Sequence, residues 1–357
     1  MITVIIMGIF ATFFAYMARY KRYRQGLKIS FTLIFIFLAL RYNFGNDYKG
    51  YFNAFYEINK YNQINYFDKF YNVELGWIFL NHLFKPFGFF AMIAVLALFN
   101  CVIYYRFIKK YVPINYYWLA VFLYIFNSQF MLVHCSAMRQ SIAIALFILS
   151  IDYIYKKDAI RYFLCIGLAS LFHTSALILI PVFLLSFFNW KMNMVIGIIA
   201  ISIFGSLFIF GKYLLPKLNE FVYTYFENYT KYSISADSKY GISIVYSVGL
   251  FLLIIFYEKI QSKEISLIFK IAMISFMFLP LRLLIQLISR VGMYFEVATI
   301  VVFPLIFMSI NKPIYKIIFL SILLFMTIYR FLPFFQSDIW RSAFETYQTI
   351  FNAPSIY

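Results

Sequence analysis

The chain has 357 residues, of which 64% are apolar, with 31 Lys and Arg against 14 Asp and Glu. The formal charge of +17 does not indicate nucleic-acid binding, because the cations are scattered over short loops and form no separate basic module. Three cysteines without CxxC or Cys/His spacing indicate neither a disulfide framework nor a metal centre. Long continuous apolar runs predict an all-α polytopic integral membrane protein, since helices satisfy their own backbone in lipid.

The first apolar run, residues 1–18, has its basic cluster (19–28) behind it rather than in front. It therefore predicts a first span with an external N-terminus and not a signal peptide. Alternation from this cytoplasmic loop gives about twelve spans, with basic residues at almost every inner loop. The predicted spans are 1–18, 29–42, 87–105, 114–133, 138–155, 159–172, 174–189, 192–214, 241–257, 265–288, 291–310 and 314–335.

The spans form one predicted transmembrane domain, 1–357, whose external segments carry most of the acids. These segments are the loops 43–86 and 215–240 and the C-terminal tail 336–357. Residues 74–84 predict a short helix lying at the outer interface. Residues 159–189 predict two short helices that meet near His173, because one long helix would put its two basic ends on opposite sides. A turn near 290–292 is placed by length alone.

Charged side chains inside apolar runs are costly in lipid and indicate pairing or function. Arg139 heads a span that starts outside, so its guanidinium and the helix N-terminus both suit a phosphate or diphosphate, and Arg290 stands in the same relation to a later span. Arg282, Gln286 and Arg290 are spaced by four, which predicts one shared helical face. The alternative is that these arginines extend to the interface or pair with Glu296.

His173, in the segment 172–176, lies at a predicted turn below the outer surface. Its side chain suits a general base that deprotonates a sugar hydroxyl. The alternative is a histidine that hydrogen-bonds between packed helices. His82 and His134 lack such a context and are interpreted as interfacial.

The external segment from Arg41 to Tyr48 holds further candidates. Arg41 is a candidate phosphate ligand, and Asp47 either orients a sugar hydroxyl or acts as a second candidate base. The alternative is a structured loop start around Gly45-Asn46. No second acid stands beside Asp47, so the sequence predicts no cation. Glu74 is either a carboxylate that orients the acceptor or an acid at a helix N-terminus.

Five segments, taken in order and spacing, resemble the EpsG-like family of Wzy-type polymerases of bacterial O-antigen, capsule and exopolysaccharide. The resemblance covers nearly the whole chain. The segments are Arg41-Tyr-Asn-Phe-Gly-Asn-Asp47-Tyr48-x-x-Tyr51, Glu74-Leu-Gly-Trp77, Arg139-Gln140-Ser-Ile-Ala143, Phe172-His173-Thr-Ser-Ala176 and Arg290-Val-Gly-Met-Tyr294-Phe295.

The resemblance implies a metal-independent membrane glycosyltransferase of GT-C-like architecture, without a cofactor, in the bacterial cytoplasmic membrane with its active site outside. Such enzymes transfer a growing glycan from undecaprenyl diphosphate onto the non-reducing end of an incoming undecaprenyl-diphosphate-linked oligosaccharide repeat. The implied partners are these two lipid-linked substrates, the bilayer, and a chain-length regulator and flippase of the same pathway. As motif residues of the substrate site, the resemblance adds Tyr48, Gln140 and Tyr294.

Two other functions compete with the polymerase. A transporter or flippase of the lipid-linked repeat predicts repeat halves and a polar site at the midplane, whereas the charges here gather towards one face. A membrane O-acyltransferase acting on an exported glycan would use His173 but gives the arginines no clear role. The polymerase makes the sharpest prediction: Arg139 and Arg290 meet in one outward-opening cavity, within reach of His173 or Asp47.

Overall fold

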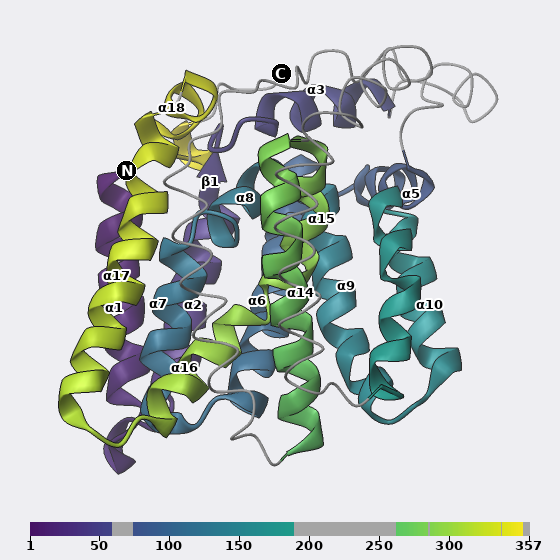
Figure 1. Cartoon of the computed structure of the whole chain (residues 1–357). Helices are drawn as coiled ribbons and strands as arrows, with labels where there is room; N and C mark the ends of the chain where they lie inside the picture. The colour runs from purple at the N-terminus through teal and green to yellow at the C-terminus, as the bar shows by residue number, and fades with distance from the viewer. Residues whose placement is uncertain (59–73, 189–261, 285, 337, 353–357) are drawn as a thin grey trace. The chain divides into compact units, whose positions relative to one another are not determined.

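A computed structural model of the chain describes residues 1–58, 74–188, 262–284, 286–336 and 338–352 (Figure 1). These residues are helical apart from loops and one short antiparallel pair, in which β1 (Arg41–Tyr42) lies beside β2 (Gln348–Thr349). The helices are α1 (Ile2–Met17), η1 (Lys21–Tyr23), α2 (Gly26–Leu40), α3 (Tyr48–Ile58), α5 (Leu75–Phe84), α6 (Phe89–Tyr111), η3 (Ile114–Tyr116), α7 (Tyr117–Phe126), α8 (Met131–Ser136), α9 (Met138–Tyr155), α10 (Ala159–Ser170), η4 (Thr174–Ser186), α14 (Lys263–Leu284), α15 (Gln286–Glu296), α16 (Thr299–Ser309), α17 (Pro313–Gln336), α18 (Asp338–Phe344) and η7 (Ile350–Asn352).

Within the described ranges, four helical stretches are long and apolar enough to cross a membrane: Lys21–Leu40, Phe89–Tyr111, Met138–Tyr155 and Pro313–Gln336. Arg290–Glu296 and Thr299–Ser309, bent by 41°, make a fifth if they are counted together. The described residues confirm the prediction of an all-α membrane protein. The count of about twelve spans and the GT-C-like architecture stay predictions, and the spans 192–214 and 241–257 and the loop 215–240 lie outside the described residues.

The chain divides into two compact units. The first contains residues 1–153, 158–180 and 303–357, and the second contains 154–157 and 181–302. The prediction of a single transmembrane domain with three external segments is not tested by this division.

In the first unit, α1 exposes large apolar side chains and buries small ones. Gly8, Ala11 and Ala15 face inward, whereas the exposed side includes Ile2, Ile6, Ile9, Phe10 and Phe13. Small residues let helices approach closely where lipid tails supply no hydrophobic drive for helix association. The Ser30 hydroxyl of α2 accordingly donates to the Ala11 carbonyl of α1 at 2.6 Å.

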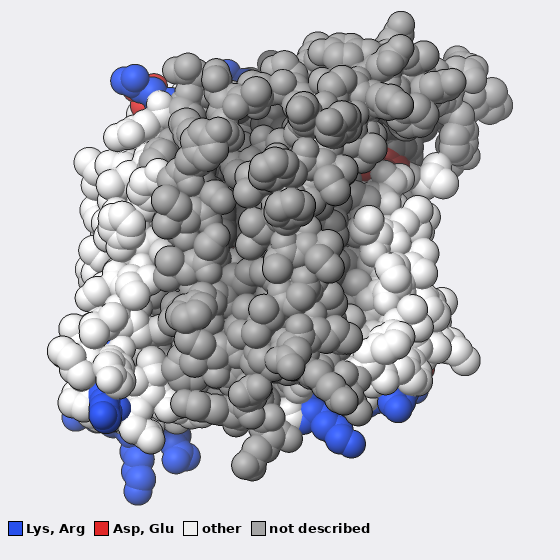
Figure 2. Space-filling view, viewed as in Figure 1, with Lys and Arg blue, Asp and Glu red and all other residues white. Residues whose placement is uncertain are grey.

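Figure 2 shows Lys and Arg along the lower edge of the molecule, whereas side chains of both signs lie at the upper left edge. Figure 1 places the α1–α2 turn, the end of α6 and the start of α17 at the lower edge. At the opposite end, the N-terminal ammonium donates to the Phe344 carbonyl at 3.4 Å, and the Gly45 amide donates to the Ala343 carbonyl at 3.1 Å. The N-terminus, the start of the loop 43–86 and the C-terminal tail, all predicted to be external, thus lie together.

Two local predictions are confirmed. Residues 74–84 contain the short helix α5 (Leu75–Phe84). The segment 159–189 is broken near His173, because α10 ends at Ser170 and η4 begins at Thr174. The Tyr162 hydroxyl of α10 donates to the Leu179 carbonyl of η4, so the two pieces run side by side.

One local prediction for this unit is wrong. The predicted span 114–133 ends at Phe126, because the side-chain carbonyl of Asn127 accepts the Gln129 amide at 3.2 Å and forms a turn before α8. His134 is buried, with its Nε2 3.3 Å from the Tyr104 hydroxyl, and its place at the membrane interface stays a prediction. The polar ring is kept inside because a buried hydroxyl is available to pair with it.

The second unit corrects the turn predicted near 290–292. The helix α15 runs through these residues to Glu296, since a single glycine is tolerated within a helix, and the chain bends at 297–298 instead. The Thr299 hydroxyl donates to the Glu296 carbonyl at 2.7 Å at this bend. In the same unit Lys270 of α14 donates to the carbonyls of Leu185 and Phe188, which gives a buried cation polar partners.

Candidate functional site

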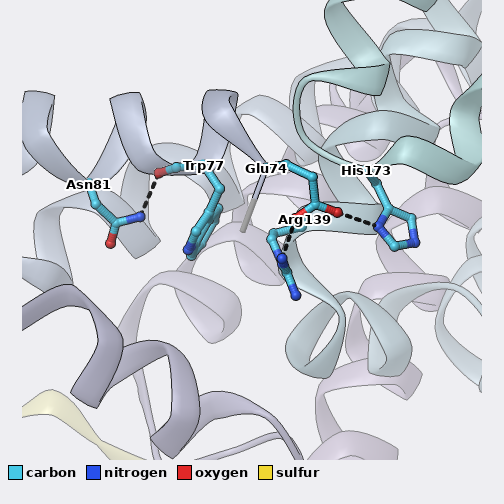
Figure 3. A network of polar contacts seen from close by, with 5 residues as sticks. All are labelled: Glu74, Trp77, Asn81, Arg139 and His173. Carbon is cyan, nitrogen blue, oxygen red and sulfur yellow. Dashed lines mark hydrogen bonds and ion pairs between the residues drawn. The ribbon is translucent and has the colours of Figure 1, made fainter. Parts of the chain in front are cut away.

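The candidate site of the first unit centres on Glu74, the residue before α5. Its backbone carbonyl accepts the Trp77 amide at 3.0 Å, as an N-cap residue should, but its side chain caps no helix amide. The carboxylate turns instead towards Arg139 and His173 (Figure 3). Only 12% of its surface is exposed, so the carboxylate is committed to these two partners.

A close backbone contact holds Glu74 in this place. The Gly76 amide donates to the Leu171 carbonyl at 2.8 Å, which docks the start of α5 on the end of α10. A Cβ atom at position 76 would lie 2.7 Å from that oxygen, so the approach requires glycine. Because His173 follows Leu171 by two residues, this docking sets the carboxylate beside the imidazole.

Arg139 is the second residue of α9, and its Nη1 pairs with Glu74 Oε2. Its guanidinium also lies over the ring of Tyr51, 5.9 Å from the centroid. Burial raises the pKa of Tyr51, and the positive charge of Arg139 opposes that rise. The Arg139 side chain keeps 29% of its surface exposed, so the guanidinium is held in place and still reachable.

His173 lies in the turn between α10 and η4, with its Nδ1 3.2 Å from Glu74 Oε1. A carboxylate at Nδ1 favours the tautomer that carries its proton there, which leaves the lone pair on Nε2. His173 Nε2 is buried and has no hydrogen-bond partner within the described residues. Glu74 thus orients the ring through Nδ1, and Nε2 is the nitrogen left without a partner in the described part of the chain.

Arg139 and His173 together decide the charge of the carboxyl group. Burial by itself would raise the pKa of Glu74, but the hydrogen bond from His173 and the charge of Arg139 outweigh it and hold that pKa below its ordinary value of 4.5. Glu74 is therefore ionised at neutral pH. Chemically, the cluster offers a guanidinium for an anion and an imidazole, backed by a carboxylate, that can take up a proton.

The loop from 41 to 48 docks next to the start of α9. Gly45, at a φ of 130°, lies so close to the end of α8, the helix before α9, that a Cβ atom would clash with the Cys135 carbonyl oxygen. The Asn46 amide donates to the Ser136 hydroxyl at 2.8 Å. Asp47 follows as an exposed residue whose carbonyl accepts the Tyr51 amide at the start of α3.

Arg41 and Tyr48 lie inside this loop rather than on its surface. Arg41 is 4% exposed and donates from Nη1 to the Leu38 carbonyl at the end of α2. Tyr48 is 1% exposed and donates to the Arg41 carbonyl at 3.1 Å. Their predicted roles in substrate binding stay predictions.

The remaining predicted site residues are spread over both units. Gln140 is buried in α9, next to Arg139. Arg290 and the buried Tyr294 belong to α15 of the second unit. The side chains of Arg282 and Gln286 lie outside what the structure describes, and so does their shared helical face. The meeting of Arg139 and Arg290 in one cavity stays a prediction.

Sequence reasoning identified Glu74, Arg139 and His173 singly but missed that one carboxylate joins the other two. It included Tyr51 in a family motif but did not predict that this ring packs against Trp77 at 4.9 Å and lies against Arg139. One sequence signal was available. Gly76 stands two residues after Glu74 at the start of a helix, and a glycine there permits the close backbone contact that positions the acid.

A model of the EpsG family matches residues 27–349, nearly the whole chain. The matched range contains all three residues of the cluster as well as Arg41, Asp47 and Arg290. Comparisons with curated proteins and with solved structures give no significant match.

Proposed function

The chain belongs to the EpsG family, and on that premise we propose that it is a Wzy-type polymerase that extends a glycan on undecaprenyl diphosphate. Family membership supports a glycosyltransferase-like polysaccharide polymerase in general terms. The finer proposal is that the growing chain passes from its lipid diphosphate to the non-reducing end of an incoming lipid-linked repeat, without a metal ion.

The observation that carries this proposal is the arrangement of Arg139 and His173 around one carboxylate, with His173 Nε2 left unpartnered in the described part of the chain. Nε2 accepts the proton of the acceptor hydroxyl as its oxygen attacks the anomeric carbon. The bond from that carbon to the diphosphate oxygen breaks, and Arg139 offsets the charge of the leaving diphosphate. Arg290 is proposed as a second guanidinium for the same group.

His173 is favoured over Asp47 as the base because a carboxylate orients its ring. Asp47 is an exposed residue of the loop before α3. We assign Asp47 to orienting the acceptor sugar.

The charge pattern of the first unit supports an external site. The basic edge of this unit carries the α1–α2 turn and the end of α6, whereas α5, which begins directly after Glu74, lies at the opposite end (Figures 1 and 2). Under the positive-inside rule the basic edge is cytoplasmic. We therefore propose that the enzyme resides in the bacterial cytoplasmic membrane and works on its outer face.

The test is complementation of a bacterial strain that lacks its own polymerase of the same pathway. Arg139→Ala and Arg290→Ala are each expected to abolish long glycans and leave single lipid-linked repeats on a gel, because the leaving diphosphate loses its counter-charge. Arg341→Ala, an exposed arginine of α18, is the matched control and should keep the normal ladder. Normal ladders from both site variants would contradict the proposal, and transport of the intact lipid-linked repeat into vesicles without elongation would favour a flippase.

A further inference from the structure

Glu74 and Arg139 already satisfy each other in a site that we have assigned to an anionic substrate. One carboxylate oxygen pairs with Arg139, and the other faces His173 Nδ1 at 3.2 Å. A diphosphate that uses Arg139 must therefore compete with Glu74. It carries more charge than a carboxylate and presents several oxygens to the planar guanidinium, which favours the diphosphate in this competition.

We propose that the diphosphate head group of the lipid-linked donor displaces the Glu74 carboxylate from Arg139, so that Glu74 then serves His173 alone. This inference rests on the proposed function of the site. Glu74 is a positioning residue in it, since it acts through Arg139 and His173 and contacts no substrate.

The groups next to Glu74 explain how displacement from Arg139 would change the charge that faces His173. Glu74 precedes α5, Arg139 comes from α9, and Tyr51 of α3 packs against Arg139. Among these groups the Glu74 carboxylate is the one that contacts His173 (Figure 3). Without donor, the charge of Arg139 offsets that of the carboxylate. With the diphosphate on Arg139, the full negative charge of Glu74 stabilises the imidazolium that forms when Nε2 takes up a proton.

The exchange makes the base strongest when the donor is bound. Donor binding and proton uptake are then coupled through one side chain, which requires no movement of a helix. Removing the charge of Glu74 should have opposite effects on two measurements: anion affinity should rise and turnover should fall.

The experiment uses purified full-length protein in detergent and two probes, radiolabelled inorganic pyrophosphate and farnesyl diphosphate, in equilibrium dialysis. Glu74→Gln keeps an acceptor for His173 Nδ1 but removes the competing charge. We expect both probes to bind about fivefold more tightly, as for loss of one partly buried ion pair. Turnover with lipid-linked repeats should fall roughly tenfold or more, because the imidazolium loses its counter-charge.

Glu57→Gln is the matched control, because it removes an exposed carboxylate of α3 that forms no ion pair with Arg139 or His173. It should change neither measurement. Glu74→Asp keeps the charge on a shorter side chain and should tighten binding about twofold, which keeps the inference testable if Glu74→Gln fails to fold.

Unchanged or weaker anion binding in both Glu74 variants would overturn the inference. If Glu74 were purely structural, its substitution would lower anion affinity and turnover together. Tightening for both probes, or for farnesyl diphosphate alone, supports it. If Glu74→Gln binds only pyrophosphate more tightly, the diphosphate that displaces Glu74 is not that of a lipid, and the inference is overturned. The dialysis needs no turnover, so a wild-type protein that binds as expected but extends no glycan would refute the proposed function and not the exchange.

Discussion

Two arginines at the same end of the first unit have opposite surroundings. Arg139 begins a helix, pairs with a carboxylate and keeps 29% of its side chain exposed. Arg41 follows the last residue of a helix, donates to a carbonyl and is 4% exposed. An arginine at a helix C-terminus satisfies carbonyls that the helix leaves unpaired, whereas one at an N-terminus adds to a positive potential that only an anion satisfies. The comparison supports the proposed anion binding by Arg139, and for Arg41 we propose a role in loop stability.

The surroundings of Arg41 extend this contrast. The Tyr347 hydroxyl donates to the Phe37 carbonyl at 2.7 Å, and its ring stacks on Phe37 at 4.4 Å. Burial raises the pKa of Tyr347 to about 12, against the lowering effect of Arg41. Arg41 thus lies where the loop after α2 meets the C-terminal segment, and it strengthens a junction between parts far apart in sequence.

The largest expected effect is the loss of turnover when His173, the proposed base, is replaced, in contrast to the loss of stability expected at Arg41. His173→Ala should lower turnover by about 100-fold or more, because the acceptor hydroxyl loses its proton acceptor. The rate of chain extension by purified protein measures this effect, and the thermal midpoint of the same sample should fall only slightly, because Arg139 still pairs with Glu74. A turnover close to that of the wild type would transfer the role of base to Asp47.

Arg41→Ala should lower the stability of the protein and leave anion binding unchanged. It removes a charge-assisted hydrogen bond from a buried place, at a cost of about 2 kcal/mol in the free energy of unfolding. The thermal midpoint should fall by a few degrees, while pyrophosphate affinity stays at the wild-type value. A loss of affinity at unchanged stability would return Arg41 to the diphosphate site, as the sequence predicts.

Gly76→Ala should disturb the site without touching its side chains. The new Cβ would lie 2.7 Å from the Leu171 carbonyl oxygen and must shift the start of α5, which carries Glu74 away from His173. Turnover should fall about tenfold, since small displacements of a positioned group are costly. Gly167→Ala, where no atom lies within 4 Å of the added Cβ, is the control. Equal turnover in the two variants would show that the contact between Gly76 and Leu171 does not position Glu74.

The smallest effect concerns acid. The pKa of Glu74 is held below 4.5, so the ion pair stabilises the fold above that pH, and its contribution is lost as pH falls through the lowered pKa. The difference in thermal midpoint between wild type and Glu74→Gln should shrink below pH 4.5, corresponding to about 1 kcal/mol at most for this partly exposed pair. A difference that shows no decrease at any acidic pH at which the protein stays folded would show that charge does not hold the pair together.

Much of the helical framework could be predicted from the chain. Run length and apolar content determine membrane helices, because each residue needs only its sequence neighbours to close the helical hydrogen bonds. The basic flanks of 159–189 were enough to predict the break near His173. The same local logic missed the turn at Asn127, where one side-chain amide competes with the helix.

The site was decided by contacts between distant segments. Glu74 lies 65 residues from Arg139 and 99 residues from His173 in sequence, and no local pattern specifies such a distance. The docking of Gly76 on Leu171 brings them together, because two backbones that hydrogen-bond fix the side chains beside them. Composition and periodicity determined that the chain folds as membrane helices with few charges. Tertiary packing decided which charges meet, since that depends on which helix ends lie side by side.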